Sequence, residues 1–270
     1  MMTEQRLDAA LASRGLARSR THAATLIAGG LVTVDGRPVV KPSVKVAPDA
    51  ALVVAASDHY VSRAAHKLIA ALDAFEVSPG GRVALDAGAS TGGFSQVLLE
   101  RGAKTVLAVD VGHGQLAPQL VDAAGLVLVE GCNVRHLTAE SLAASTGVAE
   151  RPSLVTADLS FISLPTVLPA LRETAAPSAD FVLLVKPQFE VGRGGVREGI
   201  VHDAALRSEA VMNVLWAAHD LGLHTVGVTS SPIAGSHGNR EFLVHLSATA
   251  GSDPSEWSSR VDELTGGAHG

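Results

Sequence analysis

The sequence predicts an α/β protein, in which a domain built on a mainly parallel sheet follows a small α+β domain. In the larger, C-terminal part, short apolar runs typical of buried strands alternate with segments of helical pattern. In the smaller, N-terminal part, two helical patterns precede short alternating strands around Asp35-Gly36, a strong hairpin signal. A polar stretch at about 55–61 is the expected linker, so we expect domains over 1–57 and 58–270.

The two N-terminal helices are predicted from their ends and their apolar faces. Gly15 ends the first, while Ser19 is the expected N-cap of the second and Gly29-Gly30 its end. The segment VKVAPDAALVV, after the hairpin, predicts a further strand pair. The expected buried positions are Leu7, Ala10, Leu11, Leu26 and Ile27.

The strands of the parallel sheet are predicted from apolar segments of the C-terminal part, namely VALDAGA, VLAVDVG, LVLVEG, SLVTADLS, FVLLVKP, HTVGVTSS and EFLVHLS. Helices are expected between them, among them one from Gly93 to Glu100 and one around Ala204 to Leu221. The tail from Gly251 is polar, and we expect it to be loosely held.

Composition places the chain among globular proteins. Of its 270 residues, 47% are hydrophobic and 18% charged, which is enough to bury a sizeable core. The single cysteine, Cys132, excludes a disulfide framework and a cysteine-built zinc site, and the scattered histidines predict no metal site. The N-terminus lacks the apolar segment of a secretory signal, and no window holds ~18 consecutive apolar residues. We therefore expect a cytoplasmic protein.

The charge of the chain is unevenly distributed. The net charge is −6, but residues 1–60 hold seven Lys and Arg against five Asp and Glu, or +2, so the remainder carries −8. Arg14, Arg18 and Arg20 cluster around the expected start of the second helix, where the helix dipole favours phosphate. Charge alone leaves two interpretations open, an anionic partner or an ordinary solvated face.

The N-terminal stretch RLDAALASRGLARSRTHAATLIAGGLVTVDGRPVVKPS resembles, nearly end to end, the S-four RNA-binding domain. This resemblance implies that structured RNA is bound through the two helices and the hairpin loop. The later glycine-rich segment QFEVGRGGVREGIVHD either adds phosphate contacts or is only a flexible connection, and both interpretations stay open. The basic residues expected to contact RNA are Arg6, Arg14, Arg18, Arg20, Arg37, Lys41, Arg63, Arg193 and Arg197.

The segment VALDAGASTGGFSQVLLE has the form strand, glycine-rich turn, helix, which places a ligand at the carboxyl end of the strand. Gly88, Gly92 and Gly93 permit a tight turn and a close approach of the backbone to that ligand. A nicotinamide enzyme would have the spacing G-x-G-x-x-G. Here the spacing is G-A-S-T-G-G, and the carboxylate of Asp86 suits an ammonium group but would repel a pyrophosphate. S-adenosylmethionine, which carries an ammonium, is therefore favoured over NAD and over a merely structural turn.

Two further candidate cofactor residues follow the next strands. Asp110 ends the second strand, where a carboxylate can accept hydrogen bonds from both ribose hydroxyls of a nucleoside. Asn133 follows the third strand, where an amide can read adenine. The residues expected to bind S-adenosylmethionine are therefore Asp86, Gly88, Ala89, Ser90, Thr91, Gly92, Gly93, Phe94, Asp110 and Asn133.

Two lysines and two carboxylates lie at matched places around the predicted sheet. Asp158 follows the fourth strand and Lys186 the fifth, both at the carboxyl edge. Lys67 precedes the first strand, and Glu241 begins the last. Together the four are neutral, so they can share a partly buried site, although each alone has a plainer explanation as a snorkelling or surface charge. In such a site an amine can take the proton of a ribose 2′-hydroxyl, and an ammonium can stabilise the alkoxide that forms.

Five motifs carry a second resemblance. SRAAHKL, DAGASTGGFSQ, ADLSF, LVKPQFE and NREFLVHL are similar to motifs of the FtsJ-type RNA 2′-O-methyltransferases. That family implies a Rossmann-like class I methyltransferase fold and a catalytic Lys-Asp-Lys-Glu tetrad, here Lys67, Asp158, Lys186 and Glu241. The chain departs from the family at Asn133, where FtsJ enzymes tend to have aspartate.

With an S-four domain in front, the chain is similar over nearly all of residues 4–248 to the TlyA, or hemolysin A, family. This resemblance implies S-adenosylmethionine-dependent 2′-O-methylation of cytidines in the ribosomal RNA of both subunits. It also implies that bacteria carrying such a protein are sensitive to capreomycin and viomycin.

Other classes of function are weighed against this one. An RNA base methyltransferase often has Asn/Asp-Pro-Pro-aromatic after the fourth strand, and DLSF lacks those prolines. A cysteine-dependent methyltransferase would need its thiol beside Asp158, whereas Cys132 is expected at the adenine end. A membrane-active cytolysin, which the name hemolysin suggests, would need a spanning or strongly basic amphipathic helix that the sequence lacks. An RNA-binding assembly factor without activity would need neither the tetrad nor the glycine loop.

Overall fold

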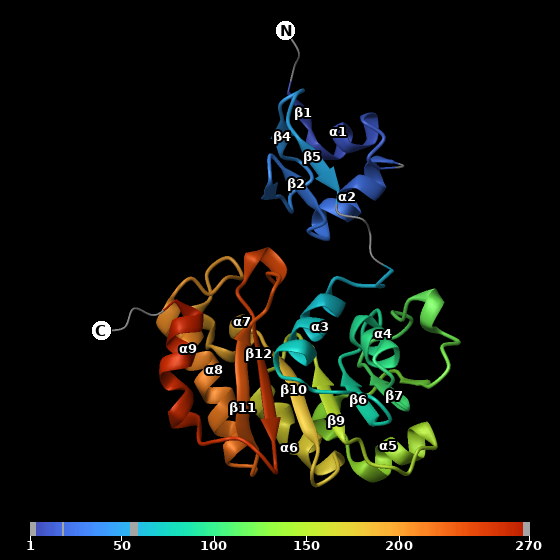
Figure 1. Cartoon of the computed structure of the whole chain (residues 1–270), viewed down its shortest axis with the longest axis vertical. Helices are drawn as coiled ribbons and strands as arrows, with labels where there is room; N and C mark the ends of the chain where they lie inside the picture. The colour runs from blue at the N-terminus through green and yellow to red at the C-terminus, as the bar shows by residue number, and fades with distance from the viewer. Residues whose placement is uncertain (1–3, 18, 55–58, 267–270) are drawn as a thin grey trace. The chain divides into compact units, whose positions relative to one another are not determined.

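The computed structural model describes residues 4–17, 19–54 and 59–266. The chain divides into two compact units, Met1–Tyr60 and Val61–Gly270 (Figure 1). Within the part that is described, no helix is long and apolar enough to cross a bilayer.

The predicted linker, at about 55–61, lies partly outside the described residues, because 55–58 are not among them. Its described end is already tied to the second unit. The backbone N–H of Val61 donates to Oε1 of Gln96 at 2.9 Å. The start of the second unit is thus anchored to the helix that follows the glycine-rich turn.

The N-terminal unit has the predicted helices and hairpin. Ser19 caps the second helix, because its Oγ accepts the backbone N–H of His22 at 3.1 Å. Asp35 and Gly36 have φ of 49° and 76°, which gives the two-residue turn that the right-handed twist of a hairpin requires. The elements are β1 (Gln5–Arg6), α1 (Leu7–Ser13), α2 (Arg20–Ala28), β2 (Val32–Val34), β3 (Arg37–Pro38), β4 (Lys45–Val46) and β5 (Leu52–Val54).

The further strand pair predicted in VKVAPDAALVV is wrong as a pair. Both strands form, but β4 pairs with β1, and β5 pairs with β2. The segment between them is held instead by Arg14, whose guanidinium donates to the carbonyls of Ala47, Pro48 and Ala50 at 2.7–3.1 Å. A pattern of alternating residues thus identified the strands but not their partners.

The C-terminal unit is built on a seven-stranded sheet of order β11-β12-β10-β9-β6-β7-β8 (Figure 1). All pairings are parallel except those of β12, which runs antiparallel to both of its neighbours. Each predicted strand is confirmed, and β6, β9 and β12 are buried along their whole length, as expected for strands covered on both faces. The strands are β6 (Val83–Ala87), β7 (Thr105–Val109), β8 (Leu126–Val129), β9 (Leu154–Ala157), β10 (Asp180–Val185), β11 (His224–Ser230) and β12 (Phe242–Ser247).

Helices cover both faces of this sheet. Two of them, α3 and α4, pack together on one face, and α5, α6 and α8 pack on the other (Figure 1). The largest hydrophobic core lies under α6 and α8 and includes Leu85, Phe181, Leu168 and Val214. The helices are α3 (Ala64–Ala74), α4 (Gly93–Glu100), α5 (Ala139–Thr146), α6 (Leu164–Thr174), α7 (Pro187–Glu190), α8 (Ala204–His219) and α9 (Ser258–Thr265), with short 3-10 turns η1 (Pro118–Leu120), η2 (Val134–His136), η3 (Arg193–Gly195), η4 (Ser236–Gly238) and η5 (Pro254–Trp257).

The strand order reverses between β6 and β9. From β6 the chain continues to β7 and β8 on one side, and it later returns to β9 and β10 on the other side. The loops after β6 and β9 therefore part in opposite directions, and open α/β sheets bind their ligands in the crevice that this leaves. The topology thus selects the carboxyl edge of β6, β9 and β10 as the place of the site.

The expectation of a loosely held tail from Gly251 is wrong for the residues described. Helix α9 packs on α8 and β11, and Val261 is fully buried. Its last carbonyls are bound by two guanidiniums: Arg207 donates twice to the Thr265 carbonyl, at 2.7 and 3.2 Å, and Arg240 donates to the Leu264 carbonyl at 2.7 Å. These groups would otherwise be the unsatisfied end of a helix.

Replacing Arg207 by Ala should destabilise the C-terminal unit. The buried guanidinium also donates to the carbonyls of Val201 and His202, so its loss strands several acceptors. We expect a cost of about 2–4 kcal/mol in the free energy of unfolding, measured by urea denaturation. Arg260→Ala, on the exposed side of α9, should lower the free energy of unfolding by at most about a tenth to a third as much. Equal stability of Arg207→Ala and wild type would contradict the stabilising role of the hydrogen bonds that Arg207 donates to these carbonyls.

Candidate active site

The glycine-rich turn after β6 forms the floor of the site. Gly88 has φ of 86°, and a Cβ on it would lie 3.0 Å from the carbonyl oxygen of Asp158. Gly92 has φ of 94°, and a Cβ there would overlap Leu116 and Leu120. Both positions favour glycine because their φ is positive, and at Gly88 a side chain would also push the turn away from the loop after β9.

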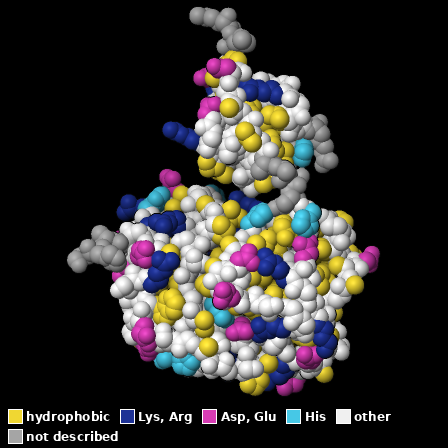
Figure 2. Space-filling view, in the orientation of Figure 1, with side chains coloured by type: hydrophobic (Ala, Val, Ile, Leu, Met, Phe, Trp, Pro, Cys, Tyr) yellow, Lys and Arg dark blue, Asp and Glu magenta, His cyan; other side chains and the backbone are white. Residues whose placement is uncertain are grey.

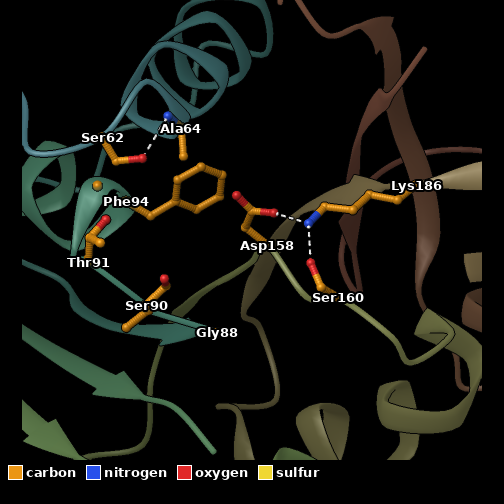
Figure 3. Close-up of a pocket in the computed structure, with 11 residues that line it drawn as sticks. Ser62, Ala64, Gly88, Ser90, Thr91, Phe94, Asp158, Ser160 and Lys186 are labelled. Atoms are coloured by element: carbon orange, nitrogen blue, oxygen red, sulfur yellow. Dashed lines mark hydrogen bonds and ion pairs between the residues drawn. The ribbon is translucent and has the colours of Figure 1, made fainter. Parts of the chain in front are cut away.

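Lys186 and Asp158 form an ion pair at the carboxyl edge (Figure 3). Lys186 Nζ lies 2.6 Å from Asp158 Oδ1 in an ion pair, and it donates a hydrogen bond to Ser160 Oγ at 2.9 Å. Only 10% of the lysine side chain and 15% of the aspartate side chain are exposed. The lysine that ends a core strand is thus stabilised by a carboxylate and a hydroxyl from the neighbouring loop, as a buried charge requires.

Lys67 and Glu241 form a second ion pair, more deeply buried than the first. Their Nζ–Oε2 distance is 2.5 Å, and the side chains are 7% and 2% exposed. Val185 is paired with Phe242 across β10 and β12, so Lys186 and Glu241 are neighbours at the end of that ladder. The structure therefore brings all members of the predicted tetrad to one edge of the sheet. Lys186 and Asp158 line a cavity at this edge.

Two adjoining cavities open at this edge. The smaller, about 160 Å³, is lined by the turn from Gly88 to Phe94 (Gly92 excepted), by Ser62 and Ala64, and by Asp158, Ser160 and Lys186 (Figure 3). The larger, about 440 Å³, shares Gly88, Ser90, Asp158 and Ser160 with it and extends to Asp110 and Asn133. Since 300–1,000 Å³ is typical of ligand pockets, the two together provide room for a nucleoside and a charged extension.

The far end of the larger cavity is polar. The carboxylate of Asp110 accepts backbone N–H groups from Ser90 at 2.8 Å and from Gly112 at 2.7 Å, which fixes its orientation. Asn133 uses its side-chain oxygen to cap η2, accepting the N–H of Arg135 at 3.0 Å. Cys132 lies beside it, and burial raises the pKa of its thiol, which makes it a poor nucleophile.

Asp86, predicted to bind the cofactor, does not reach either cavity surface. Its side chain is fully buried, and its Oδ2 accepts a hydrogen bond from Ser95 Oγ at 2.6 Å. Burial raises the pKa of Asp86 to about 7, and the nearby Asp158 carboxylate also raises it, while the bond from Ser95 opposes the rise. A direct contact of Asp86 with a cofactor ammonium is therefore not supported by this geometry.

The structure adds three residues that the sequence argument did not select. Ser160 holds Lys186, as described above. Phe161 is 91% exposed at the rim of the larger cavity and has φ of 64°, a strained value for a non-glycine residue. Glu190 accepts the backbone N–H of Leu164 at 3.0 Å, and burial raises its pKa to about 7. All three lie inside or beside the motifs ADLSF and LVKPQFE, which was the available signal.

The predicted RNA-binding residues are distributed over both units. In the N-terminal unit Arg6 and Arg20 share Asp8 as their ion-pair partner, at 2.8 and 3.4 Å, and Arg14 is used by the fold, as described above. In the hairpin region Arg37 and Lys41 are exposed. In the C-terminal unit Arg63 is half-buried at the start of α3, and Arg197 is exposed. Arg18 and the side chain of Arg193 lie outside the described residues.

Comparison with known families matches this architecture. Residues 60–248 match the FtsJ-like methyltransferase family, and residues 5–52 match the S4 domain, the S-four module named above. The resemblances predicted from the motifs are thereby confirmed. The fold and the cavity at its carboxyl edge define a class I methyltransferase that carries an S-four domain.

Individual relatives narrow the family further. The chain is 51% identical over 249 residues, 91% of both chains, to the 16S/23S rRNA (cytidine-2′-O)-methyltransferase TlyA of Mycobacterium tuberculosis. It is 38% identical to Hemolysin A of Brachyspira hyodysenteriae, over 89% of this chain and 99% of that one. The solved structure of a presumed hemolysin from Streptococcus thermophilus is 34% identical and covers 98% of this chain and 96% of its own, with a TM-score of 0.75. The chain belongs to the FtsJ-like methyltransferase family, in the group that contains TlyA and hemolysin A.

Replacing Asp86 by Asn should change how stability depends on pH. The pKa of Asp86 rises from 3.8 to about 7 on folding, so the folded protein keeps a proton that the unfolded chain loses. As the pH rises from about 4 to about 7, Asp86 therefore lowers the free energy of unfolding by on the order of 4 kcal/mol. Above pH 7 this contribution changes no further.

At pH 8 we expect a higher unfolding midpoint for Asp86→Asn than for wild type, and at pH 4 we expect no gain, measured by thermal unfolding at both values. The exposed Asp122→Asn serves as the control and should follow wild type throughout. A midpoint difference that is the same at pH 4 and pH 8 would show that burial does not hold the proton on Asp86.

Proposed function

We propose that the chain methylates the ribose 2′-hydroxyl of cytidines in the ribosomal RNA of both subunits, with S-adenosylmethionine as the methyl donor. The observation that carries the proposal is the ion pair of Lys186 and Asp158, which lines a cavity that continues to Asp110. A ribose hydroxyl needs a neighbouring group that takes its proton, and a nucleoside cofactor needs the longer part of the cavity. The name of the Mycobacterium tuberculosis relative supports the choice of cytidine and of both ribosomal RNAs.

The donor groups present fit S-adenosylmethionine. Each carboxylate oxygen of Asp110 accepts one backbone N–H and keeps a lone pair for a ribose hydroxyl. Val111, Leu159 and Ile162 line the same cavity and supply apolar surface for a purine ring. When bound, the cofactor supplies an electrophilic methyl group. The glycine-rich turn from Gly88 would hold the amino-acid end of the cofactor.

Lys186 is the proposed proton acceptor. Asp158 and Ser160 fix its Nζ from one side, which leaves the cavity side for the ribose. As a neutral amine, Nζ takes the proton of the 2′-hydroxyl while the oxygen forms its bond to the methyl carbon and the carbon–sulfur bond breaks. As an ammonium, Nζ donates to the developing alkoxide. Asp158 stabilises the ammonium in both cases: after the proton has been taken in the first, and from the start in the second.

Lys67 and Glu241 complete the site from the buried side. Because they neutralise each other at 2.5 Å, they add no net charge behind Lys186 and Asp158. They also connect α3 to the start of β12, and α3 begins at Ala64, which lines the smaller cavity together with Ser62. We infer that this pair positions the ribose through α3 and does not itself exchange protons with it.

RNA docking is assigned to the N-terminal unit. Its exposed Arg37 and Lys41 belong to the hairpin region, and Arg20 begins α2, where the helix dipole favours phosphate. On the face of the C-terminal unit drawn in Figure 2, Lys and Arg are scattered among Asp and Glu. A small dedicated module therefore accounts for binding of a structured RNA better than a general basic surface does. We also infer a cytoplasmic location for the enzyme, because ribosomal RNA is the proposed substrate.

Methyl transfer from labelled S-adenosylmethionine to isolated ribosomal subunits tests the proposal. Wild type should place label in a dinucleotide resistant to alkali, because a 2′-O-methyl group blocks cleavage of the backbone beside it. Lys186→Ala should lose about 100-fold or more in rate, as expected for the loss of a general base. The exposed Lys104→Ala, whose lysine pairs with Glu150, is the matched control and should keep full activity.

Label found on a base would contradict the 2′-hydroxyl chemistry. Full activity of Lys186→Ala would contradict the assignment of the proton acceptor. Leakage of liposomes caused by the purified protein, in place of transfer to either subunit, would favour the membrane-active alternative.

A further inference from the structure

The two segments that hold the ion pair of Lys186 and Asp158 run side by side beyond it. One is the loop 158–163 after β9, and the other is the segment 186–190 after β10. Past the ion pair, the ring of Phe161 meets the ring of Phe189, with centroids 5.1 Å apart. At the far end, Glu190 Oε1 accepts the backbone N–H of Leu164 at 3.0 Å. Three contacts in succession therefore fasten one segment to the other.

The last contact meets a need of helix α6. Ser163 occupies the N-cap position but accepts no backbone N–H with its side chain, and its Oγ faces Thr166 Oγ1 at 2.8 Å instead. Without Glu190, the N–H of Leu164 would have no acceptor at the start of the helix. A carboxylate is also favoured there by the dipole of the helix. Glu190, 26 positions along the chain from Leu164, thus provides the capping acceptor that Ser163 does not.

The loop between these contacts is held in a conformation that it would not choose alone. Phe161 has φ of 64°, and such strain persists only where the surroundings determine the backbone. Lys186 fastens the start of the loop through Asp158 and Ser160. Glu190 fastens its end through Leu164. Releasing one end would let the loop relax and shift the groups at the other.

We propose that Glu190 is a positioning residue of the methyl-transfer site, which holds loop 158–163 so that Asp158 and Ser160 stay aligned on Lys186. The inference rests on the proposed function for its effect on catalysis. Glu190 lines a different cavity, with Gly192 and Glu209. Displacements of about 1 Å in a reacting group lower the rate by large factors. The hydrogen bond from the Leu164 N–H to Glu190, called the latch below, can therefore control the rate from outside the site.

Hydrogen exchange of the peptide covering 158–166 tests the latch directly. Glu190→Ala should exchange roughly tenfold faster than wild type in this peptide, because the hydrogen bond that the Leu164 N–H donates to Glu190 is lost. Glu190→Gln keeps an acceptor oxygen and should stay close to wild type. Glu209→Ala, a carboxylate on the same small cavity, is the control and should also stay close. Unchanged exchange in Glu190→Ala would overturn the inference, whether or not the protein transfers methyl groups.

Single-turnover methyl transfer then tests the consequence. In Glu190→Ala the rate should fall roughly tenfold while the Kd for S-adenosylmethionine stays unchanged, and Glu190→Gln should restore most of the rate. Faster exchange in Glu190→Ala with an unchanged rate would overturn the positioning role. A wild-type protein that binds the cofactor but modifies no ribose would refute the proposed function, and the exchange result would still decide whether the latch exists.

Discussion

Each buried amine of the site is neutralised by its own carboxylate, and the arrangement of the strand ends depends on this pairing. Moving an isolated charge out of water costs several kcal/mol, so neither Lys67 nor Lys186 could stay at the sheet edge alone. Asp158 reaches Lys186 because β9 flanks β10, and Glu241 reaches Lys67 because α3 packs against β12. Asp86 differs from these carboxylates: its side-chain hydrogen bonds come from the hydroxyls of Ser95 and Thr156, and burial raises its pKa to about 7.

Pairing also gives the site its direction. Asp158 and Ser160 hold Lys186 Nζ from the β9 side, and Lys186 lines the smaller cavity, which adjoins the larger one that extends to Asp110. The same loop is strained at Phe161 and is fastened at its far end by Glu190. Charge pairing, loop conformation and helix capping therefore all affect the position of Lys186 Nζ relative to Asp158 and Ser160. A change in any of them should displace the lysine.

The sequence predicted the parts of this structure that depend on local physics. Apolar runs closed by glycine, aspartate or proline located the strands, and strand ends located Asp158 and Lys186 at one edge. It did not predict that α9 is ordered, because two guanidiniums from distant segments supply what its polar surface cannot. Nor did it predict the roles of Ser160 and Glu190, since both meet partners 26 residues away, across neighbouring strands. Contacts of this kind follow from strand order, which a residue pattern alone does not contain.

A crystal structure with bound S-adenosylhomocysteine would test most directly whether this edge is the methyl-transfer site. The adenosine should occupy the larger cavity, with its ribose hydroxyls on Asp110, and the sulfur should face the smaller cavity, toward Lys186 and Asp158. A ligand bound elsewhere, or one with its sulfur turned away from these two residues, would contradict the central claim that the paired lysine lies beside the reacting methyl group.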